Sequence, residues 1–130
     1  MDGRGVAALK LAANGGHKAV VQQLLKMGAD VDMKSSGGTT ALHWAVGIGH
    51  EAVVRLLLEE RVNVNAQDQY GERVLHRAAG FGYEAVVWLL LKKRAADVNA
   101  QDGSGETALH IAARGEHKAV VQLLLKKREE

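Results

Sequence analysis

The sequence predicts an all-α repeat protein, a solenoid of helix-turn-helix units joined by hairpin-like loops. Two observations indicate this fold: the chain aligns on itself at a fixed period, and each copy of the repeat holds two short segments with helical apolar patterning. A unit of about 33 residues cannot bury both of its apolar faces alone. Neighbouring units must therefore stack and share a continuous hydrophobic core.

The period of the repeat is visible in the glycines. Gly5, Gly38 and Gly71 are spaced by 33 residues, whereas Gly71 and Gly105 are separated by 34. The additional residue falls within residues 93–97, which predicts an insertion in a loop. We therefore expect residues 1–130 to form one domain, in which the four copies of the repeat span about residues 2–34, 35–67, 68–101 and 102–130.

The second copy shows the expected elements in order. An apolar segment at residues 40–46 precedes a glycine-bearing turn at 47–49, and a second apolar segment follows at 51–58. Within 51–58, valines and leucines at positions i, i+1, i+4 and i+5 make one stripe of a helix, while Arg55 faces water. Residues 61–71 contain Asn, Asp and Gly, which favour turns over helix. Each helix pair is therefore expected to be followed by a hairpin-like loop.

These copies resemble the ankyrin repeat. The segments at 38–43 (GTTALH), 49–54 (GHEAVV) and 64–68 (VNAQD) are similar to its successive signature segments, and the resemblance covers nearly the whole chain. It implies a stack whose loop tips and first helices line a concave surface that binds other proteins. The residues around Asn99 are also similar to sites at which ankyrin repeats are hydroxylated on asparagine, although Asn is common in such loops because it suits the turn.

The starts of the first helices differ between copies. The family usually has proline after the capping threonine, but this chain contains no proline. Thr40 and Thr107 can cap their helices through the hydroxyl oxygen, whereas Ala7 and Arg73 occupy the same position and cannot. We therefore expect the first helices of copies one and three to fray more easily.

The six histidines fall into two ladders at the period of the repeat. Successive members of a ladder are expected about 10 Å apart, whereas a zinc ion needs its ligands at about 2 Å. Equivalent histidines therefore cannot share one ion, and we expect no metal or other cofactor. The resemblance implies that the first ladder hydrogen-bonds to threonine and to backbone in the neighbouring repeat, and that the second supports the turn between helices. The ladders are His43, His76 and His110, and His17, His50 and His117.

No catalytic constellation is recognisable in the sequence. Ser35, Ser36 and Ser104 lie in loop segments without a nucleophile motif, and the glycines make no phosphate-binding fingerprint. The acidic residues are scattered by the repeat over an elongated surface instead of converging in a cleft. We therefore expect a protein that is not an enzyme.

Charge and hydropathy restrict the class of partner. Lys and Arg number 17 against 15 Asp and Glu, and the net charge of +2 is too small to indicate a nucleic-acid or membrane surface. No apolar run approaches the roughly 18 residues of a membrane span. The absence of cysteine excludes disulfides and suits a reducing compartment. We expect an intracellular, cytoplasmic protein that binds neither nucleic acid nor membrane.

The candidate binding surface consists of positions that differ between copies. These positions fall in three places: in the hairpin, directly after the loop glycine, and near the end of the first helix. At the hairpin positions, copy one carries Gly3 and Arg4. Ile48, Tyr70 and Phe81 are expected to cluster on the middle two copies as an apolar centre with a polar rim, the usual anatomy of a binding hot spot. The alternative is that Ile48 and Phe81 only pad the turn between helices. The predicted partner-binding residues are Thr39, Ile48, Gln69, Tyr70, Glu72, Phe81, Ser104, Glu106 and Arg114.

Three further features concern the outer surface and the tryptophans. Trp88 stands where the other copies have polar residues, so we expect it to be exposed on the second helix, either as a second contact or as a lone apolar side chain. Trp44 is expected to be half-buried. The basic residues at 92–94 and 126–128 are expected to be neighbours, where they form a basic patch or stabilise the helix ends.

These features together predict a protein-binding module that acts through its concave face. Two alternatives remain open at this stage: an engineered or structural repeat scaffold with no natural ligand, and a fragment of a larger multidomain protein. Apolar faces on the outermost copies also predict weak end-to-end self-association.

Overall fold

The computed structural model describes residues 3–94 and 96–129, and the side chains of residues 7–92 and 96–128. Within these ranges the secondary structure is entirely helical, which confirms the all-α prediction. The helices are α1 (Gly3–Asn14), α2 (Lys18–Lys26), α3 (Ala41–Ile48), α4 (Glu51–Glu59), α5 (Val74–Phe81), α6 (Glu84–Arg94), α7 (Ala108–Arg114) and α8 (Lys118–Glu129).

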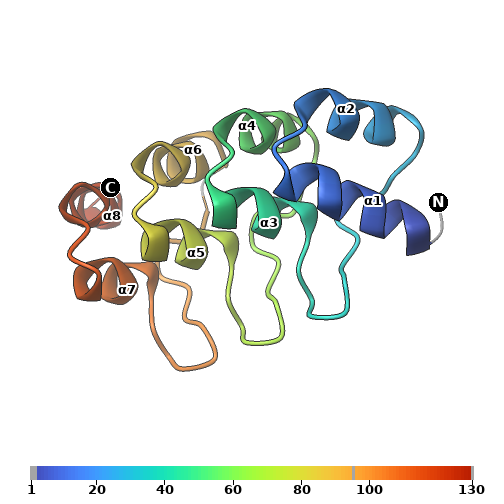
Figure 1. Cartoon of the computed structure of the whole chain (residues 1–130). Helices are drawn as coiled ribbons and strands as arrows, with labels where there is room; N and C mark the ends of the chain where they lie inside the picture. The colour runs from blue at the N-terminus through green and yellow to red at the C-terminus, as the bar shows by residue number, and fades with distance from the viewer. Residues whose placement is uncertain (1–2, 95, 130) are drawn as a thin grey trace.

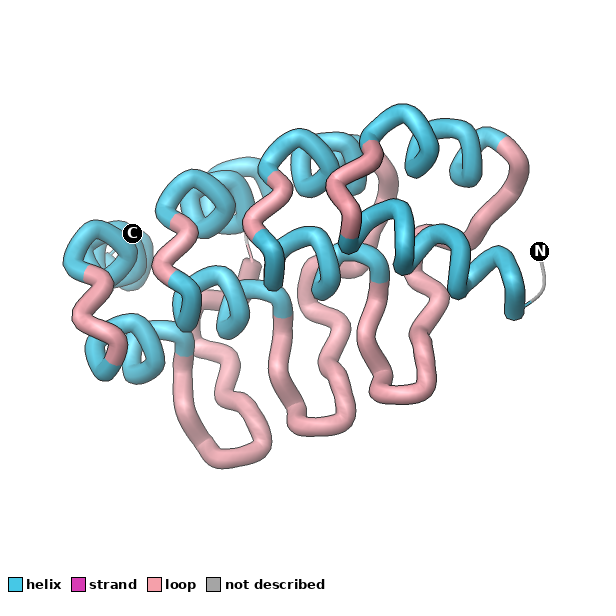
Figure 2. Tube along the Cα trace, viewed as in Figure 1, coloured by secondary structure: helices cyan, strands magenta, loops and turns pink. Residues whose placement is uncertain are grey.

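The helices stack in two parallel layers (Figure 1). The inner layer consists of α1, α3, α5 and α7, and the outer layer consists of α2, α4, α6 and α8. Each helix contacts the next member of its own layer and its partner in the same copy, which is the neighbour-only contact pattern of a solenoid. The loops that connect one helix pair to the next project from the same edge of the stack as long hairpins (Figure 2).

The caps of the inner helices follow from threonine, histidine and glycine at fixed offsets. Thr40 Oγ1 accepts the backbone N–H of His43 at 3.3 Å, and His43 Nδ1 accepts the backbone N–H of Thr40 at 3.1 Å, so the two residues cap α3 reciprocally. Thr107 and His110 repeat the same cap on α7. Gly49 ends α3 with φ 78°, a conformation that glycine adopts without steric cost.

Copies one and three lack this threonine, with different results. The backbone N–H of Arg73 still donates to His76 Nδ1 at 3.0 Å, but the Arg73 side chain provides no cap, as the sequence predicted. In copy one the prediction that Gly3 and Arg4 lie in a loop is wrong, because α1 begins at Gly3 and runs through both residues. Ala7 has no side-chain acceptor to stop the helix, and the alanines and leucine that follow it are strong helix formers.

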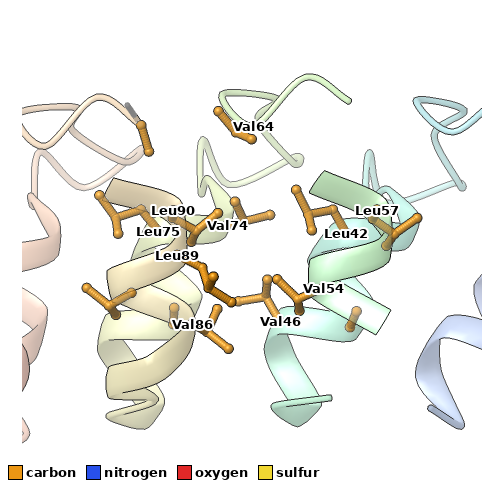
Figure 3. Close-up of a cluster of buried hydrophobic side chains, with 14 of the residues drawn as sticks. Leu42, Val46, Val54, Leu57, Val64, Val74, Leu75, Val86, Leu89 and Leu90 are labelled. Carbon is orange, nitrogen blue, oxygen red and sulfur yellow. The ribbon is translucent and has the colours of Figure 1, made fainter. Parts of the chain in front are cut away.

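The hydrophobic core runs through the whole stack between the two layers of helices. Leu42 and Val46 of α3 meet Val54 and Leu57 of α4, and the pattern recurs one copy further with Leu75, Leu89 and Leu90 (Figure 3). At one equivalent position of the four inner helices stands an alanine that is almost or completely buried, so the inner helices can pack closely against one another. These alanines are Ala12, Ala45, Ala78 and Ala112.

The first histidine ladder joins α3 and α5 to backbone that follows each helix in the chain. His43 Nε2 lies 3.1 Å from the carbonyl oxygen of Glu72, and His76 Nε2 lies 3.0 Å from that of Ala100. Because Nδ1 of each ring accepts a backbone N–H, Nε2 carries the proton and donates it to the carbonyl. Burial lowers the pKa of His43 below its ordinary value, which keeps the ring neutral. The structural role that the resemblance implied is confirmed for His43, which contacts both Thr40 and backbone of the next copy. His76 has Arg73 in place of the threonine, and its backbone partner Ala100 lies within the predicted bounds of copy three.

Two kinds of site do not occur in the part of the chain that the structure describes. No group of three or more His, Asp or Glu side chains within those residues is arranged to hold a metal ion. None of the described helices combines the length and the apolar content needed to cross a membrane.

Candidate functional site

The hairpins present their tips along one edge of the stack, and backbone hydrogen bonds join adjacent tips. The N–H of Gln69 donates to the carbonyl oxygen of Gly37 at 3.0 Å, and the N–H of Gly103 donates to that of Tyr70 at 2.8 Å. Gly103 permits this approach because a Cβ at that position would lie 2.6 Å from the Tyr70 oxygen. The tips of copies two, three and four therefore form one continuous strip.

Aspartates hold the individual tips in shape. Asp68 Oδ1 accepts the backbone N–H groups of Tyr70 and Glu72, both at 2.9 Å, and so fixes the turn between them. Asp102 Oδ1 does the same for Ser104 at 2.9 Å and Glu106 at 3.0 Å. Gln69, Tyr70 and Ser104 are exposed at these tips, with Tyr70 at 69% of its full exposure.

A partly buried ion-pair cluster lies where the hairpin of copy three meets α5. Arg77 Nη2 lies 3.2 Å from Asp68 Oδ2, and Arg77 Nε lies 3.2 Å from Glu72 Oε1. The Asp68 side chain is only 2% exposed. Burial alone raises the pKa of Asp68, but the backbone N–H groups of Glu72 and Tyr70, together with Arg77, outweigh burial and hold the pKa below its ordinary value. The sequence prediction included Glu72 but missed Arg77.

The pKa of Glu72 is shifted in the opposite direction to that of Asp68. Burial raises its pKa above the ordinary value, and the neighbouring carboxylate of Asp68 adds to this effect, while Arg77 counteracts it only in part. In copy four the predicted residues Glu106 and Arg114 are brought together as an exposed ion pair, with Arg114 Nη2 3.0 Å from Glu106 Oε1. The hydrogen bond from Arg114 lowers the pKa of Glu106.

A second group of predicted residues gathers where the inner helices end. Ile48 is the last residue of α3 and Phe81 is the last residue of α5, and their side chains are 49% and 58% exposed. The Phe81 ring stacks on Tyr83, with centroids 5.6 Å apart and planes inclined by 19°. Tyr83 in turn packs over Gly49, since a Cβ on Gly49 would lie 3.0 Å from the tyrosine ring. We call Ile48, Phe81 and Tyr83 the helix-end patch.

Tyr83 was not among the predicted residues, although the sequence contains a signal for it. The second histidine ladder has tyrosine at this one position. His50 Nε2 lies 2.9 Å from the carbonyl oxygen of Asn14, and His117 Nε2 lies 3.1 Å from that of Gly80. Copy three replaces this polar link between copies with an aromatic ring, and the helix-end patch results.

The structure divides the predicted cluster of Ile48, Tyr70 and Phe81 into two parts. Tyr70 lies in the hairpin before α5, and Phe81 lies at the opposite end of this eight-residue helix. A helix of that length extends about 12 Å. The candidate site therefore consists of a strip of hairpin tips and a separate helix-end patch, with the inner helices between them.

Thr39 contributes to the site mainly by holding Trp44. The Thr39 hydroxyl accepts a hydrogen bond from Trp44 Nε1 at 3.1 Å and is also paired with the Ser35 hydroxyl. Lys10 Nζ lies 4.7 Å from the centroid of the Trp44 ring. Trp44 is half-buried, as the sequence predicted.

Two predictions concern the outer layer. Trp88 on α6 is 42% exposed, which confirms the expected position. The predicted basic patch falls partly on Lys93 and Arg94, whose side chains lie outside the described residues.

Comparison with known families assigns the repeat. The family model described as "Ankyrin repeats (3 copies)" matches residues 9–102, and the model described as "Ankyrin repeats (many copies)" matches residues 82–125. No individual curated protein matches the chain. Ankyrin repeats are generally protein–protein interaction modules and are typically not enzymes. Because the first match covers well over half of the chain, this protein belongs to the ankyrin repeat family.

Proposed function

We propose that this chain is a non-catalytic module that binds another protein through its hairpin tips and its helix-end patch. The observation that carries the proposal is the exposure of Ile48 and Phe81, together with the stacking of Phe81 on the Tyr83 ring. Large apolar side chains that remain accessible and rest on a packed aromatic ring are typical anchors of a protein interface.

The hairpin tips suit the role of a polar rim. Asp68 and Asp102 hold the backbone of the tips through paired hydrogen bonds, so that binding costs little further ordering of these loops. Tyr70 projects from this strip and offers both an aromatic surface and a hydroxyl group.

The proposed interface also has a specific charge arrangement. Glu72 and Glu106 occupy equivalent positions in copies three and four, and each is paired with an arginine of its own copy. A partner that approaches this face meets carboxylates that are already paired with arginines. We therefore propose that the apolar anchors supply most of the affinity, and that the ion pairs supply orientation.

Affinity purification with mass spectrometry tests the proposal. The native chain is compared with a Tyr70→Ala, Phe81→Ala double variant, and with Met27→Ala as a control that removes a 66% exposed side chain from copy one. All three proteins are first shown to unfold at similar temperatures. The proposal predicts a protein that is retained by the native chain and by the control but is lost from the double variant.

Two results would contradict the proposed function. A partner that is retained equally by the double variant would show that binding uses another surface. If no protein is retained by the native chain from any plausible lysate, the alternative of a repeat scaffold without a natural ligand becomes the better description.

A further inference from the structure

The outer layer carries a pocket that does not belong to the proposed interface of hairpin tips and helix-end patch. A shallow hollow of about 300 Å³ opens between α4 and α6 and is lined by Arg55, Glu84, Ala85 and Trp88. Trp88 is 42% exposed there, and the equivalent positions of the other copies hold Gln22, Arg55 and Gln122. The tryptophan is therefore not required by the packing of the repeat.

Copy two shows which interaction normally occupies this position. Arg55 Nε and Nη2 both donate to Glu51 Oε1, at 3.1 Å and 2.9 Å, across one turn of α4. Glu84 is the equivalent of Glu51 in the next copy, and Trp88 is the equivalent of Arg55. Glu84 consequently lacks a cation one turn further along, and it makes no ion pair with any other described residue.

The charges in the pocket favour a positively charged guest. Arg55 directs two hydrogen bonds to Glu51, so its charge is neutralised within its own helix. The unpaired charge in the lining is therefore the carboxylate of Glu84. An indole ring attracts cations over its face, and the contact of Lys10 with Trp44 shows this interaction elsewhere in the same chain.

We propose that the pocket between α4 and α6 binds an arginine side chain of a partner protein. The guanidinium group stacks on Trp88 and donates hydrogen bonds to the Glu84 carboxylate, which restores between two molecules the pairing that Arg55 and Glu51 make within one helix. Arginine suits the site better than lysine because its planar group combines stacking with a forked hydrogen bond. This site lies on the outer helices and is independent of the proposed concave interface.

Nuclear magnetic resonance titration tests the proposal with a defined probe. The probe is a blocked pentapeptide with arginine between glycines, and its control carries citrulline, which has the same shape without the charge. The signals to follow are the indole N–H of Trp88 and the backbone amides of Glu84 and Ala85. We expect saturable shifts with the arginine peptide and no saturable shift with the citrulline peptide.

Three variants localise the binding. Glu84→Gln should weaken the arginine peptide roughly five-fold, as expected for the loss of one exposed charge-assisted contact. Glu59→Gln removes an exposed carboxylate from α4 outside the pocket and should leave the affinity unchanged. Trp88→Gln introduces the residue that copies one and four carry at this position, so it is compatible with the fold, and it should abolish the shift of the Ala85 amide.

The proposal is overturned by any of three results: equal shifts with the arginine and citrulline peptides, an unchanged affinity in Glu84→Gln, or no saturable shift with the native protein. Thermal unfolding of each variant shows that the fold is intact. Because the concave residues Tyr70 and Phe81 are unaltered throughout, failure of this site leaves the proposed function of the concave face standing.

Discussion

The rings of Phe81 and Tyr83 are stacked, with centroids 5.6 Å apart, at the one position where the second histidine ladder is interrupted. In the neighbouring copies this position carries His50 and His117, whose Nε2 atoms contact backbone carbonyls of the preceding copy. The third copy thus has an exposed phenylalanine stacked on a half-buried tyrosine where its neighbours have a structural hydrogen bond. Under the proposed function, residue 83 therefore serves binding at the cost of a hydrogen bond that the other copies make.

Tyr83→His should separate these two roles. The histidine is expected to donate to the backbone of copy two as His50 and His117 do with their neighbours, which adds a hydrogen bond worth about 1 kcal/mol. The variant should therefore unfold at an equal or higher urea concentration than the native protein. Its affinity for a captured partner should fall, because Phe81 loses its stacked support. A variant that is both less stable and equally tight in binding would refute this assignment of the helix-end patch.

Arg77→Leu should destabilise the protein by about 1–3 kcal/mol, because it leaves the nearly buried carboxylate of Asp68 without its cation. Leucine is the residue that copy one carries at the same position, so the change itself fits an inner helix. Arg114→Leu is the control, since its partner Glu106 is 29% exposed whereas Asp68 is 2% exposed. Urea unfolding of both variants checks the prediction, and equal effects of the two substitutions would contradict it.

Gly103→Ala should cost about 1–3 kcal/mol, because the added Cβ would lie 2.6 Å from the carbonyl oxygen of Tyr70 and force two hairpins apart. Gly37→Ala provides the control in a neighbouring hairpin, where the nearest atom to the new Cβ is the Gln69 side-chain nitrogen at 3.8 Å. Chemical unfolding should show a clear shift for Gly103→Ala and almost none for Gly37→Ala. If the two shifts agree, the contact between the tips of copies three and four does not stabilise the stack.

Stability should decrease as the pH falls below about 6.5, the ordinary pKa of histidine. The pKa of His43 is lowered in the folded protein by burial, so the unfolded chain takes up a proton at a pH where the folded chain does not. The free energy of unfolding therefore decreases between pH 6.5 and the lower pKa that His43 has in the folded protein. Well above pH 6.5, His43 causes no such decrease. The urea midpoint measured from pH 8 to pH 5 should show this slope, and His43→Gln should reduce it. An identical slope in the variant would assign the pH dependence to other groups.

At lower pH the two acidic groups of copy three act in opposite directions. Asp68 has a lowered pKa, so its contribution to stability is present above its ordinary value and is lost as the pH falls through the folded pKa. Glu72 has a raised pKa, so its contribution is complete at low pH and is lost as the pH rises through the folded pKa. Titration of both carboxyl groups by nuclear magnetic resonance should find Glu72 above and Asp68 below their ordinary values. The reverse order would contradict the described cluster.

The sequence by itself determined the features that depend on residues close together in the chain and on the repetition of the copies. The period of the glycines, the apolar stripes and the caps at Thr40 and Thr107 each require only a few neighbouring residues, and the structure confirms them. Stacking of the copies followed because one helix pair cannot bury its own apolar surface. The exposed position of Trp88 followed from comparison with its polar equivalents in the other copies.

The tertiary structure decided which side chains meet across copies and between hairpin and helix. The packing of Tyr83 over Gly49 joins copy three to copy two, and the pairing of Arg77 with Asp68 depends on how the hairpin folds over α5. It also decided that Gly3 lies in a helix, whereas Gln69, the equivalent residue of copy three, lies in a hairpin although copy three lacks the threonine cap as well. Such contacts join residues at different positions of the repeat. The repeat pattern does not say which of these positions meet, so the contacts follow only from packing in three dimensions.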